Sequence, residues 1–142
     1  MSNKYNFVLL DCAPGFDVEA IAAMHVAGGL LIVSNPDYPS IAAAARAIEY
    51  AKALRVPLGG LVLNKVENRK HELKSDDIED SLKVKILQKI HYDRKVSESI
   101  ASRTPIVFLR PGNKVSVAYK KLAGSLIGEK YNDNLLRRIL GY

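Results

Sequence analysis

Short, unbroken apolar runs recur along the chain and predict β-strands that are buried on both faces. Each run is too short for an ordinary helix and shows no polar alternation. The runs cover residues 7–10, 30–33, 58–63 and 105–109. Residues 84–90 instead alternate between apolar and polar side chains, which predicts a partly buried strand toward one edge of the sheet.

The stretches between these strands are predicted to be helices, because they show helical spacing and begin with capping residues. Asp17, Ser40 and Asp93 each stand where a side chain can accept a hydrogen bond from a free N–H of a helix start. The expected helices cover 17–27 and 40–54, then begin near Ser75, at Asp93 and after the 110–113 loop, the last reaching Ile127. Regular alternation of strand and helix predicts one α/β domain over residues 1–130, a parallel β-sheet with flanking helices and right-handed crossovers.

Composition and charge narrow the class of protein. With 142 residues, 48% apolar and 25% charged, the chain fits a single globular domain. No run approaches a membrane span and the first residues lack a signal-peptide core, so a cytoplasmic protein is expected. The single cysteine, Cys12, cannot form an internal disulfide and is interpreted as a packing residue. Of the net charge of +6, five units lie from Arg110 onward, which fits either an anionic partner or a solvated helix face.

Two polar residues follow predicted strands at the edge where parallel sheets bind ligands. Asp11 ends the strand 7–10 and precedes a Pro14-Gly15 turn, so it is either a metal ligand or a turn and cap residue. Asn64 ends the strand 58–63, and its amide could match a purine or simply form a turn. The three histidines have no metal-ligand spacing and are interpreted as surface residues.

Four segments in order resemble the MinD/ParA group of P-loop ATPases, most closely its MinD-type members. They read Leu-Leu-Asp-Cys-Ala-Pro-Gly at 9–15, Ser-Asn-Pro-Asp-Tyr-Pro-Ser at 34–40, Val-Leu-Asn-Lys-Val at 62–66 and Leu-Arg-Pro-Gly-Asn at 109–113. The resemblance implies that Asp11 holds a magnesium-bound water and that the Gly15 backbone senses the γ-phosphate. It also implies ATP or ADP and Mg²⁺ as cofactors, with adenine held by Asn64 and by the loop of Arg110, Pro111, Gly112 and Asn113. Glu67 replaces the Asp of the guanine-specific version of the Asn motif, which favours adenine.

One element of the family pattern is missing from this sequence. A P-loop ends in Gly-Lys-Ser/Thr, and no Gly-Lys dipeptide occurs in the chain. The resemblance therefore implies the C-terminal part of such an ATPase, without the N-terminal P-loop strand and helix, and no efficient hydrolysis by this chain alone. Without that strand, residues 7–10 would have an unpaired apolar edge, so a homo-oligomer, a rearranged sheet or a partner chain supplying the P-loop is expected.

The sequence is consistent with two functions. The chain is either a portion of an ATP-binding protein that places the division site or partitions chromosomes or plasmids, or a non-catalytic module acting through protein or membrane contacts. Residues 131–142 predict a short amphipathic tail helix, with Leu135, Leu136, Ile139 and Leu140 on one face beside Arg137 and Arg138. This helix would either lie on an anionic membrane or pack on the domain, and no specific nucleic acid partner is expected.

Overall fold

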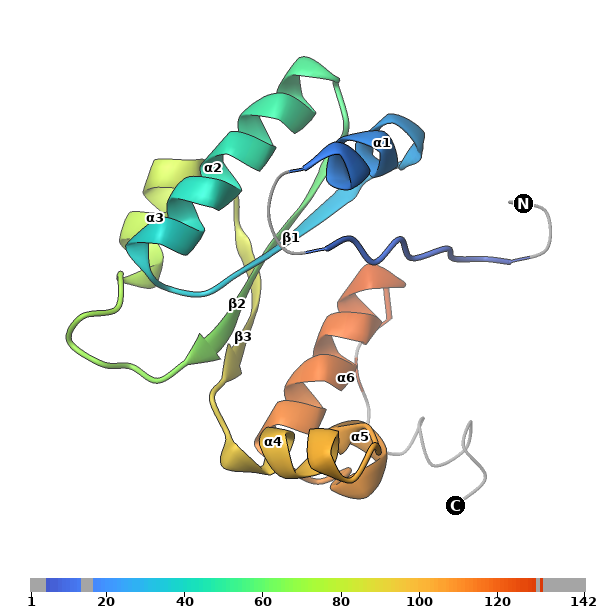
Figure 1. Cartoon of the computed structure of the whole chain (residues 1–142), viewed down its shortest axis with the longest axis vertical. Helices are drawn as coiled ribbons and strands as arrows, with labels where there is room; N and C mark the ends of the chain where they lie inside the picture. The colour runs from blue at the N-terminus through green and yellow to red at the C-terminus, as the bar shows by residue number, and fades with distance from the viewer. Residues whose placement is uncertain (1–4, 14–16, 130, 132–142) are drawn as a thin grey trace.

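A parallel β-sheet forms the centre of the molecule. The computed structural model describes residues 5–13, 17–129 and 131. Within these residues the sheet has three parallel strands in the order β1 (Leu30–Ser34), β2 (Leu58–Val66) and β3 (Ile86–His91) (Figure 1). Helix α2 (Tyr38–Ala53) connects β1 to β2, and α3 (Ser75–Leu82) connects β2 to β3. The predicted parallel α/β sheet with flanking helices is confirmed, and β3 lies at an edge as its alternating sequence indicated.

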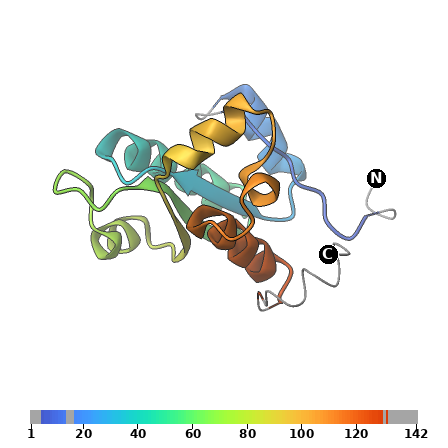
Figure 2. The same ribbon diagram turned by 90° about the horizontal axis from the view of Figure 1, so that it is seen from below.

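Helices cover both faces of this sheet (Figure 2). On one face, α2 and α3 bury a core with β1 and β2, whose largest members are Ile48, Leu61, Leu63 and Ile78. On the other face lie α4 (Arg94–Ala101), α5 (Ile106–Leu109) and α6 (Lys114–Leu126). The second core contains Val62, Ile90, Ile106, Val115 and Ala118. Helix α1 (Val18–Val26) precedes β1.

Two of the three predicted helix caps, Asp17 and Asp93, are confirmed. The carboxylate of Asp17 accepts a hydrogen bond from the N–H of Ala20 at 3.0 Å, as expected for α1. Asp93 caps α4 in the same way. The prediction of Ser40 as the cap of α2 is wrong, because Asp37 accepts from the N–H of Ser40 at 2.9 Å and the helix begins at Tyr38. Proline in the first helical turn needs no N–H partner, so Pro39 fits inside the helix.

The predicted strand at 105–109 is wrong. This segment forms the one-turn helix α5, in which the carbonyl of Pro105 accepts from the N–H groups of Phe108 and Leu109 at 2.9 and 3.0 Å. Ile106 is buried against α6 while Phe108 and Leu109 are exposed. A short apolar run cannot be assigned to strand or helix by periodicity alone, which explains the error.

The predicted buried strand at 7–10 is also wrong. Phe7, Val8, Leu9 and Leu10 form no strand and are all exposed, Leu9 to 83%. No neighbouring strand reaches them in the part of the chain described, so no backbone ladder holds them in a sheet. The prediction for Gly15, and the tail helix except for Tyr131, fall outside the described residues.

Candidate nucleotide site

Strand β2 bulges at the residue predicted to contact a purine. Lys65 has a φ of 54°, in the left-handed region, and the pairing of β2 with β3 shifts register between Leu63 and Val66. The side-chain carbonyl of Asn64 accepts from the N–H of Lys65 at 3.0 Å. Its amide NH₂ has no hydrogen-bond partner among the described residues. Bulges and left-handed residues concentrate at functional sites, and here they leave a half-buried amide able to donate to a ligand.

The carboxyl ends of β2 and β3 are held together beside this bulge. The carbonyl of Val66 accepts from the N–H of Tyr92 at 3.0 Å, and Nδ1 of His91 lies 3.2 Å from the same oxygen. His91 is exposed, as expected, and its ring contacts the backbone of Val66 near the carboxyl end of β2. The chain then reaches Asp93 at the start of α4.

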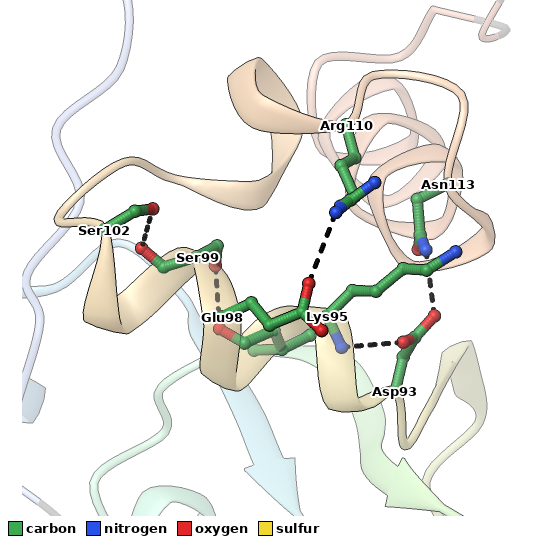
Figure 3. A network of polar contacts seen from close by, with 8 residues as sticks. Asp93, Lys95, Glu98, Ser99, Ser102, Arg110 and Asn113 are labelled. Atoms are coloured by element: carbon green, nitrogen blue, oxygen red, sulfur yellow. Dashed lines mark hydrogen bonds and ion pairs between the residues drawn. The ribbon is translucent and has the colours of Figure 1, made fainter.

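Asp93 joins the starts of two helices (Figure 3). One carboxylate oxygen accepts from the N–H of Lys95 at 2.8 Å and the other from Nδ2 of Asn113, also at 2.8 Å. Asn113 in turn caps α6, because its side-chain oxygen accepts from the N–H of Val115 at 2.7 Å. The hydrogen bond from Asn113, followed by that from Lys95, lowers the pKa of the Asp93 carboxyl below its ordinary value.

Side chains of α4 and α6 hold the loop 110–113, and the outer surface of the loop is exposed to solvent. Arg110 pairs with Glu98 of α4 at 3.3 Å, and Nζ of Lys120 donates to the carbonyl of Pro111 at 3.1 Å. The buried hydroxyl of Ser116 lies 2.7 Å from the carbonyl of Arg110. A methyl group added at Gly112 would meet no atom within 4 Å. The backbone of this loop is therefore both ordered by its neighbours and accessible to a ligand.

The structure brings some of the predicted site residues to one edge and leaves others apart. Asn64 and the loop 110–113 lie at the same edge of the sheet, linked through Val66 and Asp93. Asp11 lies in the exposed segment before α1 and has no hydrogen bond or ion pair with any described residue. Among those residues, no three His, Cys, Asp or Glu side chains come close enough to hold a metal ion.

Sequence reasoning missed the residues that hold the loop in place. Asp93 was recognised only as the cap of α4, while Glu98 and Ser116 carried no assignment. Their partners are 20, 12 and 6 residues away along the chain. Spacings of 12 and 20 residues have no periodic signature, so only the Asp93 cap could be predicted.

A parallel sheet with open loops at its carboxyl edge defines an α/β domain of the kind that binds ligands at that edge. The sequence pattern of the CobQ/CobB/MinD/ParA nucleotide binding domain matches residues 1–106, so the chain belongs to this family. The predicted MinD/ParA relationship is confirmed.

Individual relatives agree with this assignment. The chain is 32% identical to an uncharacterized ATP-binding protein of Methanocaldococcus jannaschii over 92% of its own length and 50% of the relative. MinD of Pyrococcus horikoshii, solved with Mg-ADP, superposes with a TM-score of 0.79 at 25% identity, over 87% of this chain and 51% of that one. The MinC:MinD cell division complex of Aquifex aeolicus gives 0.82 at 28% identity, over 92% and 55%. The chain thus spans about half the length of these relatives. None of the described helices is long and apolar enough to cross a membrane.

Proposed function

We propose that this chain is the adenine-binding and Walker B portion of a MinD-type ATP-binding protein that acts in cell division. The observation that carries the proposal is the loop 110–113, which is fixed at the same carboxyl edge of the parallel sheet as the Asn64 bulge. The relative from Pyrococcus horikoshii was solved with Mg-ADP, which supports a nucleotide at this edge. A role in partitioning has no separate support from these relatives.

The adenine contacts divide between one side chain and a backbone loop. The NH₂ group of Asn64 is available as a donor, whereas the side chain of Asn113 is already engaged with Asp93 and Val115. Arg110 likewise pairs with Glu98. We therefore assign base recognition to the Asn64 amide and to the exposed backbone of residues 110–113.

The phosphate side of the site is only partly supplied by this chain. The exposed carboxylate of Asp11 has the chemistry to hold a water on Mg²⁺, and Gly15 is assigned to the γ-phosphate. Because no Gly-Lys dipeptide is present, the P-loop would come from another polypeptide segment. We expect no efficient hydrolysis by the 142 residues alone. The alternative function is a binding module that turns nothing over.

Nucleotide preference tests the proposal. The chain should bind ADP more tightly than GDP in an NMR or calorimetric titration. Asn64→Ala should weaken ADP binding about tenfold, as expected for the loss of about 1.4 kcal/mol of hydrogen bonding. Gln88→Ala removes an amide from the middle of β3 and should leave the affinity unchanged. Equal affinity for the two nucleotides, or equal loss in both variants, would contradict the assignment.

The predicted tail at 131–142 is proposed as a contact with anionic membranes. Two arginines and a small apolar face would give weak, salt-sensitive binding, since each basic residue near such a surface adds about 1 kcal/mol. The full chain should co-sediment with anionic liposomes at low salt and less at high salt, and a chain ending at Lys130 should not. Equal binding by both chains, or by neither, would make the tail a structural element.

A partner protein is also proposed. The MinC:MinD cell division protein complex of Aquifex aeolicus is a structural neighbour, which supports a protein partner for this chain.

A further inference from the structure

A groove lies along β3, between α3 and α6. These two helices pack on opposite faces of the sheet (Figure 2). The groove has a volume of about 610 Å³, within the usual range of ligand sites. All residues that line it lie between Ser75 and Lys121, inside the described part of the chain. It meets the proposed adenine loop only at Gly112, so we treat it as a separate surface and call it the β3 groove.

One side of α6 provides the apolar part of the β3 groove. Four of its residues line the groove at spacings of three, four and seven, which places them on one helical face: Lys114, Val117, Ala118 and Lys121. Val117 is half-buried and Ala118 is buried, whereas both lysines are exposed. The groove therefore has an apolar surface flanked by cations.

Three lysines give the β3 groove an excess of positive charge. Lys89 from β3 joins Lys114 and Lys121 in the lining. None of the three forms an ion pair with any residue that the structure describes. Lys114 is also the first residue of α6, where the positive end of the helix dipole disfavours a cation. Such charges around an apolar surface are complementary to a ligand that carries both carboxylates and apolar side chains.

Two carboxylates on the α3 side of the groove disfavour a nucleic acid. Asp76 and Glu79 contribute to the lining, and Glu79 pairs with Lys85 at 3.1 Å. A nucleic acid carries a charge at every phosphate and would meet these carboxylates, whereas a peptide can place its acidic side chains beside the lysines alone. Among the described residues that line the groove, none is Phe, Tyr or Trp, so bases would lack the usual stacking partners.

The backbone of β3 is partly occupied by side chains. The carboxylate of Glu79 accepts from the N–H of Ile86 at 2.6 Å, and the side chain of Gln88 donates to the carbonyl of Lys89 at 3.0 Å. Hydrogen bonds of this kind hinder the addition of another strand to the sheet. Recognition in the β3 groove therefore depends on side chains, with charge and apolar contact as its two components.

We propose that the β3 groove binds an acidic peptide segment of a partner protein. The carboxylates of this segment lie beside Lys89, Lys114 and Lys121, and its apolar side chains pack against Val117 and Ala118. This inference concerns the surface formed by β3 and α6 and does not depend on nucleotide binding.

Two synthetic peptides test the proposed chemistry. One fluorescein-labelled hexapeptide alternates glutamate with valine, and the other alternates glutamine with valine. In fluorescence polarisation titrations of the full chain at low salt, the glutamate peptide should bind saturably and about tenfold more tightly than the glutamine peptide, and added salt should weaken it. Absence of saturable binding, equal affinity for the two peptides, or tighter binding of a labelled thymidine hexanucleotide would overturn the proposal.

Two matched substitutions separate the groove from the overall charge of the chain. Lys121 in α6 and Lys52 in α2 are both exposed helical lysines, so Lys121→Glu and Lys52→Glu change the net charge equally. Lys121→Glu should weaken binding of the glutamate peptide about fivefold, and Lys52→Glu should change it less than about twofold. An equal loss in both variants would show attraction to net charge alone and overturn the proposal.

Amide chemical shifts locate the contact. On addition of the glutamate peptide, the largest shifts should occur in residues 86–91 and 114–121. Shifts confined to other regions would overturn the proposal. A free chain that sediments as a dimer and protects these same amides from hydrogen exchange would assign the groove to a second copy and would also overturn it.

Discussion

At the scale of single residues, Asp93 is the side chain on which the candidate site depends most. It is separated from the end of β3 only by Tyr92, caps α4 and accepts a hydrogen bond from Asn113, which caps α6. The loop 110–113 leads from α5 into α6 and is further held by the ion pair of Arg110 with Glu98. One carboxylate thus connects the end of the sheet to the loop proposed to contact adenine.

The pH dependence of stability tests this role of Asp93. Its hydrogen bonds favour the charged form and lower its pKa in the folded state, so its contribution is present above the ordinary value of 3.8 and is lost as the pH falls through the lowered pKa. Asp93→Asn should therefore lower the melting temperature at pH 7, and the difference from the wild type should shrink as the pH falls below 3.8.

Asp80→Asn provides the matched control for that measurement. Asp80 is an exposed aspartate of α3 with no hydrogen bond to any of the described residues. Its replacement makes the same change in charge and should leave the melting temperature nearly unchanged at pH 7. Parallel pH profiles for the two variants would show that the Asp93 hydrogen bonds do not stabilise the folded state.

At the scale of elements, most local signals were readable from the sequence, although the cap of α2 was assigned to Ser40 and not to Asp37, and long-range signals were not readable. Asp17 and Asp93 were identified as caps because a cap contacts N–H groups two or three residues ahead. The strand prediction failed at 105–109, where packing against α6 decides the conformation. It failed at 7–10 because a strand needs a neighbour, and no local pattern shows whether that neighbour exists.

The same contrast between local and long-range signals applies to the candidate site. Asn64 could be placed at the ligand edge from its position after an apolar run. The bulge at Lys65 could not, because a left-handed lysine has no distinct sequence signal. The link from Asp93 to Asn113 spans 20 residues and depends on how α4 and α6 pack.

Gly60 shows how closely β2 and β3 approach each other. It has a φ of 136°, a backbone conformation that residues with a side chain rarely adopt. An added Cβ would also collide with the side chain of Leu87. Gly60→Ala should lower the free energy of unfolding by about 2 kcal/mol or more, from backbone strain and overpacking together. Chemical denaturation measures this change.

Gly112→Ala is the control for Gly60→Ala. A Cβ at Gly112 meets no atom within 4 Å, so the substitution should change the free energy of unfolding by less than about 0.5 kcal/mol. A similar loss for both variants would mean that the effect at Gly60 comes from glycine replacement in general and not from the contact of β2 with β3.

At the scale of the whole molecule, the described residues form a three-stranded parallel sheet with helices packed on both faces. The chain belongs to the CobQ/CobB/MinD/ParA family and spans about half the length of its relatives. Its carboxyl edge carries the proposed adenine contacts, whereas Asp11 lies in an exposed segment outside the sheet. Base recognition is thus proposed for this chain, whereas phosphate binding is proposed to need a P-loop from another polypeptide segment.

The most direct test of this account is an amide chemical-shift titration of the full chain with ADP and Mg²⁺. The largest shifts should occur at Asn64, Lys65 and residues 110–113, and GDP should produce much smaller shifts at the same concentrations. Shifts confined to other regions, equal responses to ADP and GDP, or no saturable response at millimolar nucleotide would contradict the proposed adenine site.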